Sequence, residues 1–237
     1  MPFPSLRRFF GTKPDLEEVL VPALERIRGD LPPFDTEGIG AVRGLLEYLE
    51  REQLYTHLDP DECTVLRERI YNHYWTKCLA RIELKLEMAF ELDLDYALEA
   101  LDTLLVQFTA LETRVPEIRD YPEAAKQLQA LHERTRNLFR QTFAVVIQVI
   151  QDAATRGQLV RCKYFTPNLL HGRAEDLGRD SEPYRFARDY FQLLHWRRSL
   201  VMFPSFAESS KYQNLIHHLG FSVPDPVEVG FPEAINP

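Results

Sequence analysis

Residues 122–156 read PEAAKQLQALHERTRNLFRQTFAVVIQVIQDAATR, and this stretch indicates the fold most clearly. Small and apolar side chains recur at intervals of four and three residues, the spacing of one helix face. This face comprises Ala124, Leu128, Leu131, Thr135, Leu138, Thr142, Val145 and Val149, and a second stripe comprises Phe139, Phe143, Val146 and Ile150. A helix that is apolar nearly all round is surrounded by others. We therefore expect a long central helix over 122–156, ended by Gly157.

Start and stop signals divide the rest of the chain into further helices. Asp59 and Pro60 form a cap and a first-turn proline, and Asp93 or Asp95 caps the next helix. Ser205 opens a capping box before a final helix that ends at Gly220. The predicted helices cover about 14–28, 37–57, 60–92, 95–115, 122–156 and 183–202, together with this final helix.

The length and composition favour one all-α domain. With 237 residues, 45% of them hydrophobic, the chain can bury a substantial core, and its ten glycines are few for its length. We predict a single-domain bundle of about six to seven helices over residues 1–221. Residues 222–237 contain four prolines and almost no periodicity, so we expect a Pro-rich extended tail there.

The charge is acidic overall but unevenly distributed. A formal net charge of −8 argues against a protein that coats nucleic acid or an anionic membrane, because such binding neutralises phosphates with Lys and Arg. Residues 156–198, however, hold nine Lys and Arg against five Asp and Glu, a net charge of +4. A site for an anion is therefore expected in this segment if the chain has one.

The cysteines and the hydropathy pattern predict a cytoplasmic protein. Cys63 and Cys78 fall on one predicted helix about 22 Å apart, too far for a disulfide, and Cys162 completes an odd number. We interpret all three as reduced thiols. The N-terminus lacks the pattern of a secretory signal, and the longest apolar run, residues 143–147, is too short to span a bilayer.

Residues 164–186, YFTPNLLHGRAEDLGRDSEPYRF, interrupt the long helices. Thr166 and Pro167 predict a capped turn that Gly172 ends, and residues 174–178 predict a second turn. Ser181 then caps a helix of about 183–202. The periodicity places Tyr190, Leu193, Leu200 and Phe203 on the inner face of that helix.

The cationic segment supplies the candidate residues for an anionic ligand. The ligand-binding candidates are Arg161, Lys163, Arg173, Arg179, Arg185 and Arg197, and the acid–base candidates, if the chain is an enzyme, are Tyr164, His171 and His195. An alternative interpretation is that the arginines pair with the acidic body of the protein. Arg197 shares the inner face with Tyr190, which predicts either a structural ion pair or the base of a binding pocket.

No motif indicates a metal, a cofactor or a particular reaction. His171, Glu175 and Asp176 offer at most three ligands, and HExxH and ExxH patterns are absent from the sequence. The sequence also lacks GxSxG, Walker A and GxGxxG motifs. We therefore predict no metal and no cofactor, and the absence of these motifs favours a protein without catalytic activity.

The stretch YNHYW at residues 71–75 is the candidate interface. Tyr71, His73, Tyr74 and Trp75 bring four rings into five residues, a pattern typical of a core or of an interface hot spot. We therefore predict a helical protein–protein interaction protein, an adaptor, assembly or regulatory factor, with another protein or a second copy as partner. The alternatives are an enzyme or binding protein for an anionic small molecule that uses residues 161–198, and a helical protein associated with nucleic acid.

Overall fold

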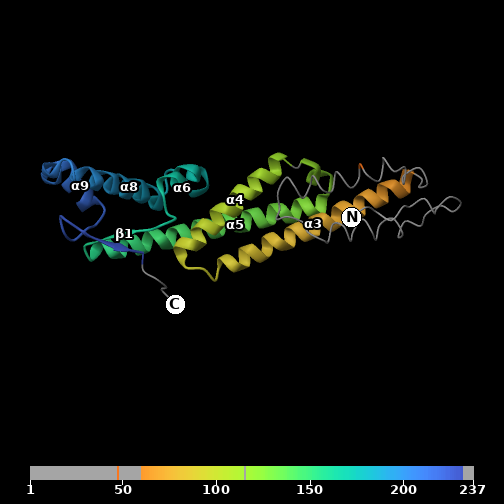
Figure 1. Cartoon of the computed structure of the whole chain (residues 1–237), viewed down its shortest axis with the longest axis horizontal. Coiled ribbons are helices and arrows are strands. Elements are labelled where there is room, and N and C mark those ends of the chain that lie inside the picture. The colour runs from red at the N-terminus through yellow and green to blue at the C-terminus, as the bar shows by residue number, and fades with distance from the viewer. Residues whose placement is uncertain (1–46, 48–59, 115, 232–237) are drawn as a thin grey trace, which may run out of the picture. The chain divides into compact units, whose positions relative to one another are not determined.

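The computed structural model describes residue 47, residues 60–114 and residues 116–231 (Figure 1). Within these residues the fold is all-α, as predicted, with seven α-helices, two short 3-10 helices and one sheet of two strands. The helices predicted over 14–28 and 37–57 lie outside the described residues, except for Glu47.

Three long helices come first in the described part of the chain. They are α3 (Pro60–Ala89), α4 (Leu94–Arg114) and α5 (Pro122–Thr155), and the 3-10 helix η3 (Pro116–Asp120) joins α4 to α5. Shorter elements follow: β1 (Gln158–Arg161), α6 (Pro167–Gly172), α7 (Ala174–Leu177), α8 (Glu182–Leu200), η4 (Pro204–Glu208), α9 (Ser210–His218) and β2 (Val227–Gly230). The predicted long helix over 122–156 is thus confirmed.

The chain divides into two compact units, and the three long helices contribute to both. One unit comprises Met1–Lys85 and Val106–Leu131, and the other comprises Leu86–Leu105 and His132–Pro237. In the first unit Leu66 and Ile70 are fully buried, and the Tyr71 and Tyr121 ring centroids lie 5.1 Å apart. The single domain expected over residues 1–221 stays a prediction.

The core of the second unit is built on the C-terminal half of α5. Phe139, Val146 and Ile150 are fully buried there, as the helical periodicity predicted. The prediction is wrong for Val145, whose side chain is 46% exposed. Gln141 and Gln148 on the same face are also exposed, so the described residues do not enclose α5 on all sides.

Side-chain caps set the starts of the short helices. The Thr166 hydroxyl accepts a hydrogen bond from the Leu169 N–H, and the Ser181 hydroxyl accepts one from the Tyr184 N–H, as predicted. The last helix is different, because its cap is Ser209 rather than Ser205. Residues Pro204–Glu208 form the 3-10 helix η4, which delays the start of α9 beyond the predicted capping box.

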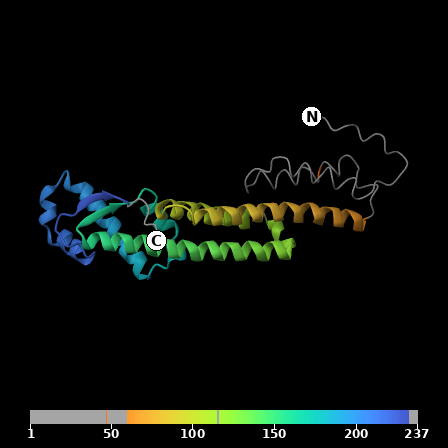
Figure 2. The same cartoon turned by 90° about the horizontal axis from the view of Figure 1, so that it is seen from below.

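Part of the C-terminal segment pairs with an earlier strand. β2 lies parallel to β1 with Gln158 opposite Val227, and the Val227 N–H donates to the Gly157 carbonyl at 2.9 Å. Figures 1 and 2 show both strands beside the C-terminal end of α5. The sequence analysis predicted no sheet, because each strand has only four residues and the two are far apart in the chain.

None of the described helices between residues 60 and 218 combines the length and the apolar character that a bilayer crossing requires.

Gly157 has two constraints, a positive φ of 72° and a close approach of the tail. A Cβ at this position would lie 2.8 Å from Cγ2 of Val223, whereas a Cβ at Gly220, where φ is 79°, would have no atom within 4 Å. We expect Gly220→Ala to lower the free energy of unfolding by about 1 kcal/mol through backbone strain alone. Gly157→Ala should cost about 2 kcal/mol because the contact with Val223 adds to the strain.

Urea denaturation measures both changes. In a Val223→Ala background the cost of Gly157→Ala should fall to that of Gly220→Ala, because the obstructing methyl group is gone. Equal costs of the two substitutions in the wild-type background would contradict the close approach.

Candidate functional site

The loop between β1 and α6 is held by a buried carboxylate, that of Asp95 in the first turn of α4. Asp95 is 6% exposed. Its Oδ2 accepts from the Lys163 N–H at 2.6 Å, and its Oδ1 accepts from the N–H groups of Tyr164 and Phe165 at 3.1 and 3.2 Å. Asp93 takes the capping position of α4, where its carbonyl accepts from Ala97 N–H at 2.8 Å. Asp95 therefore binds a distant segment instead of its own helix.

The side chains next to these hydrogen bonds contact other groups of the same chain. The Lys163 ammonium lies 4.8 Å from the centroid of the Tyr164 ring, and that ring is 4.8 Å from the Tyr96 ring. Burial, together with the charge of Asp95, raises the pKa of the Cys162 thiol, so this cysteine is a poor nucleophile at neutral pH. Of the predicted residues, the loop brings Lys163 and Tyr164 together as a cation–aromatic pair.

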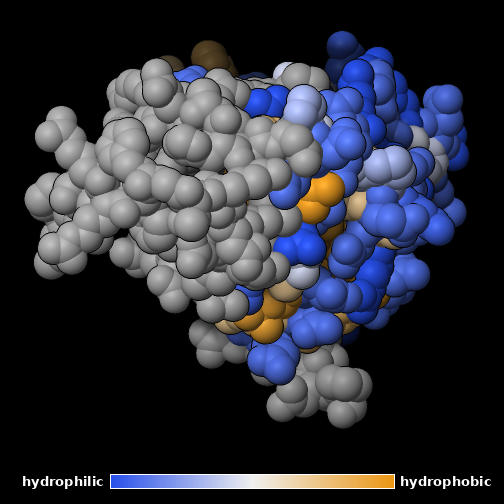
Figure 3. All heavy atoms as spheres, turned by 90° about the vertical axis from the view of Figure 1, so that its right-hand side faces the viewer, coloured by the Kyte–Doolittle hydropathy of each residue, from blue (hydrophilic) through white to orange (hydrophobic). Residues whose placement is uncertain are grey.

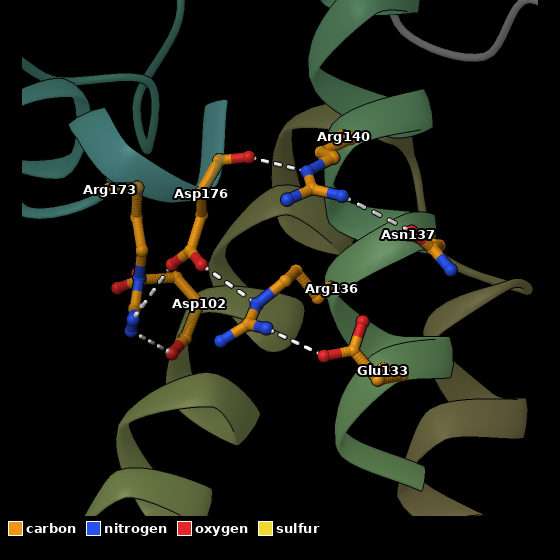
Figure 4. Close-up of polar contacts among 7 residues, drawn as sticks. All are labelled: Asp102, Glu133, Arg136, Asn137, Arg140, Arg173 and Asp176. Atoms are coloured by element: carbon orange, nitrogen blue, oxygen red, sulfur yellow. Dashed lines mark hydrogen bonds and ion pairs between the residues drawn. The ribbon is translucent and has the colours of Figure 1, made fainter. Parts of the chain in front are cut away.

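Arg173 is the centre of a network of ion pairs that joins the two short helices to α4 and α5 (Figure 4). Its Nε lies 2.5 Å from Oδ1 of Asp102, and its Nη2 donates to the Asp102 carbonyl at 2.9 Å. Its Nη1 is 3.6 Å from Oδ2 of Asp176. The Arg173 side chain is only 12% exposed, so this contact excludes most water.

Two arginines of α5 complete the network from the other side. Arg136 contacts Asp176 at 2.8 Å and Glu133 at 2.7 Å, and Arg140 donates to the Asp176 main-chain carbonyl. Figure 4 shows both arginines pointing from α5 toward Asp176. Arg136 and Arg140 were not among the predicted site residues, because nothing in the helical periodicity of α5 indicates a partner that lies 36 residues or more further along the chain.

Three further predicted ligands lie on other elements. Arg161 pairs with Glu228 across the sheet at 2.6 Å, while Arg179 and Glu175 form a weak pair at 3.9 Å. Arg185 is exposed on α8. None of the interactions found among the described residues joins these three cations to one another.

Arg197 forms an ion pair, as one of the two sequence interpretations stated. Its Nη1 lies 3.0 Å from Oδ1 of Asp225, and its side chain is 22% exposed. This contact ties the C-terminal segment to α8. On the same helix the Tyr190 hydroxyl donates to the Val160 carbonyl of β1, and burial raises the pKa of that hydroxyl.

The acid–base candidates are separated in the fold. His171 is exposed in the last turn of α6, and His195 is exposed on α8, near the opposite end of that helix from α6. Among the residues that the structure describes, no three His, Cys, Asp or Glu side chains are grouped so that they could hold a metal ion. The structure thus does not assemble His171, His195 and Tyr164 into one catalytic centre within its described part.

The predicted interface at residues 71–75 is buried in the first unit. Tyr71 is 8% exposed, and Tyr74 and Trp75 are each 1% exposed. The Tyr74 and Trp75 rings meet edge to face, with centroids 4.9 Å apart. His73 is half-buried. The cluster belongs to the core, because its three largest rings have almost no surface to offer to a partner.

Exposed apolar side chains gather at two places in the second unit. The apolar tip, between α8 and η4, is Val201, Met202 and Phe203, which are 85%, 77% and 62% exposed. The apolar turn, between α3 and α4, is Met88, Phe90, Leu92 and Tyr96, which are 57%, 57%, 45% and 47% exposed. By contrast, the described part of the face in Figure 3 is mainly hydrophilic, with small hydrophobic patches.

The apolar tip corrects the prediction for Phe203. Phe203 was predicted on the inner face of a helix over 183–202, but α8 ends at Leu200. Beyond that residue the helical periodicity no longer decides which side chains point inward. A run of large apolar residues directly before Pro204 was the signal that could have indicated an exposed turn.

Comparison with protein-family models, with curated protein sequences and with solved structures finds no match in any of the three.

Asp95→Asn should lower the free energy of unfolding by about 3 kcal/mol, because an amide places its own N–H donors against the backbone N–H groups that the carboxylate accepts. The matched control is Asp93→Asn, which should change stability by less than about 0.5 kcal/mol, since Asn and Asp cap helices equally well. Urea denaturation measures both variants. Similar losses in the two would contradict the role given to Asp95.

The Arg173–Asp102 pair should show a coupling free energy of about 1 to 2 kcal/mol in a double-mutant cycle of Arg173→Met and Asp102→Asn. This value allows for the 32% exposure of the Asp102 side chain. The control cycle, Arg179→Met and Glu175→Gln, should give less than about 0.5 kcal/mol because both side chains are mostly exposed. A coupling in the first cycle no larger than in the control would show that the network does not stabilise the fold.

Proposed function

We propose that this chain is a helical protein–protein interaction protein, an adaptor, assembly or regulatory factor without catalytic activity. The observation that supports this is the apolar tip, three consecutive large apolar residues that are 62% to 85% exposed. Covering each such side chain contributes about 1.5 to 3 kcal/mol. An apolar surface of this kind on a water-exposed turn is typical of a binding site for another protein.

The tip is also held in one conformation, which favours binding. The Met202 and Phe203 N–H groups donate to the Ser199 carbonyl at 3.1 and 3.0 Å. Behind the tip, the Trp196 and Phe206 rings meet edge to face with centroids 5.4 Å apart. Because the turn is ordered before a partner arrives, little conformational entropy is lost on binding.

Ion pairs within the chain weaken the case for an anionic ligand. Four of the six predicted ligands pair with carboxylates of the chain itself, Arg161, Arg173 and Arg197 closely and Arg179 at 3.9 Å. An anion would have to replace those carboxylates. Binding of an anionic small molecule through residues 161–198, association with nucleic acid and a cytoplasmic location stay predictions.

Replacing the tip should weaken partner binding without unfolding the protein. We expect the double variant Met202→Ser and Phe203→Ser to bind its partner at least about tenfold more weakly, because two anchoring side chains are lost. The measurement is affinity purification of the tagged chain from its native cells, with quantification of stoichiometric partners. Val145→Ser, which removes another exposed apolar side chain, is the control and should retain the partner.

Two results would contradict the proposal. One is a partner that the tip variant retains as well as the wild type does. The other is the absence of any stoichiometric partner together with a purely monomeric protein in sedimentation.

A further inference from the structure

We propose that the apolar tip of one copy binds the apolar turn of a second copy, so that the chain associates head to tail with itself. This inference rests on the proposed function and names the partner of the tip. It starts from the two exposed apolar surfaces of the second unit, which are built from different segments of the same chain.

The apolar turn has an acidic rim. Residues 86–105 contain six Asp and Glu and no Lys or Arg. On the Tyr96 side of the turn, the Lys163 ammonium lies 5.8 Å from the centroid of the Tyr96 ring, so the acidic groups define the rest of the rim. Asp95 and Asp102 are occupied by the contacts described above, while Glu87, Glu91 and Asp93 are exposed beside the apolar side chains of the turn. A partner for this surface therefore needs an apolar centre with basic groups around it.

The apolar tip has a positive charge on its α8 side. Residues 190–207 contain no Asp or Glu, and Arg197 and Arg198 are their charged side chains, while the exposed Glu208 follows at the end of η4. Asp225 neutralises Arg197, whereas Arg198 is exposed three residues before Val201. A partner for the tip therefore needs an apolar centre with acidic groups around it, which is what the apolar turn offers.

The charges also decide which pairing is favoured. Tip against tip would bring Arg198 of both copies together, and turn against turn would bring the two acidic rims together. Like charges that face each other across an interface disfavour both arrangements. The contact between the tip of one copy and the turn of another joins two apolar surfaces and also places positive charge opposite negative charge.

Such an interface is heterologous, since the two copies contribute different surfaces. A dimer formed in this way still presents one unused tip and one unused turn. Association continues until a ring closes, or it forms an open chain. The average mass in solution should consequently rise with protein concentration.

Sedimentation velocity of the full chain over a concentration series tests the proposal. The tip variant is Met202→Ser with Phe203→Ser, and the turn variant is Phe90→Ser with Leu92→Ser. Each variant alone should stay monomeric, because every possible tip–turn contact contains one damaged surface. An equal mixture of the two should form a one-to-one dimer and nothing larger, because it contains one intact pair of surfaces. Val145→Ser should associate as the wild type does.

Charge variants test the register of the contact. Arg198→Glu and Glu91→Arg should each weaken association by about three- to tenfold at low salt, and the double variant should recover most of the loss. If the double variant associates no more strongly than the single variants do, the proposed pairing of the two charged rims is overturned.

Other occupants of the tip give different results. A wild-type chain that stays monomeric at all concentrations, or a mixture of the variants that stays monomeric, overturns self-association. The affinity purification distinguishes the two proposals. If the wild type binds a stoichiometric protein other than a second copy of this chain, and the tip variant does not, the proposed function stands and only this inference fails. A wild-type chain that is monomeric and sediments with vesicles of phosphatidylcholine and phosphatidylserine, while the tip variant does not, would assign the tip to a membrane surface instead.

Discussion

The carboxylate of Asp95 is the constraint on which the second unit of this protein depends. A buried negative charge without partners costs several kcal/mol, so it has to be surrounded by donors. The chain meets this demand with three consecutive backbone N–H groups, those of residues 163–165, at 2.6 to 3.2 Å. Because they belong to one short segment, a single side chain on α4 determines where the chain passes after β1.

The other contacts of the unit follow from that position. Phe165 is placed between Phe143 and Phe191, with ring centroids 5.6 and 4.7 Å away. Further along the chain Arg173 forms an ion pair with Asp102. After α7, the helix α8 begins at Glu182. Of the charged residues predicted as ligands, Arg173 attaches the short helices to α4, whereas Arg161 and Arg197 attach the C-terminal segment. Among the described residues, the apolar tip at the end of α8 and the apolar turn between α3 and α4 are the places where large apolar side chains gather uncovered.

Local signals were the parts of the fold that could be predicted. The caps Thr166 and Ser181, and Gly157 and Gly220 with their positive φ, depend on the backbone within a few residues, so the sequence indicates them directly. Ser205 shows the limit of such signals, because an intervening 3-10 helix moved the cap to Ser209. Phe203 was assigned to the wrong side for a similar reason, since its helix ends before the residue that the periodicity selected.

By itself the sequence determined that this is an all-α protein with a long helix over about 122–156, and that short helical turns in its cationic stretch separate the long helices. Helical periodicity and caps act over three or four residues, which is why they are readable there. Only the tertiary structure decided that Asp95 binds residue 163, that Arg173 binds Asp102, and that β1 pairs with β2. These partners are about 70 residues apart in the chain, and a charged or hydrogen-bonding group has no sequence pattern that specifies so distant a partner.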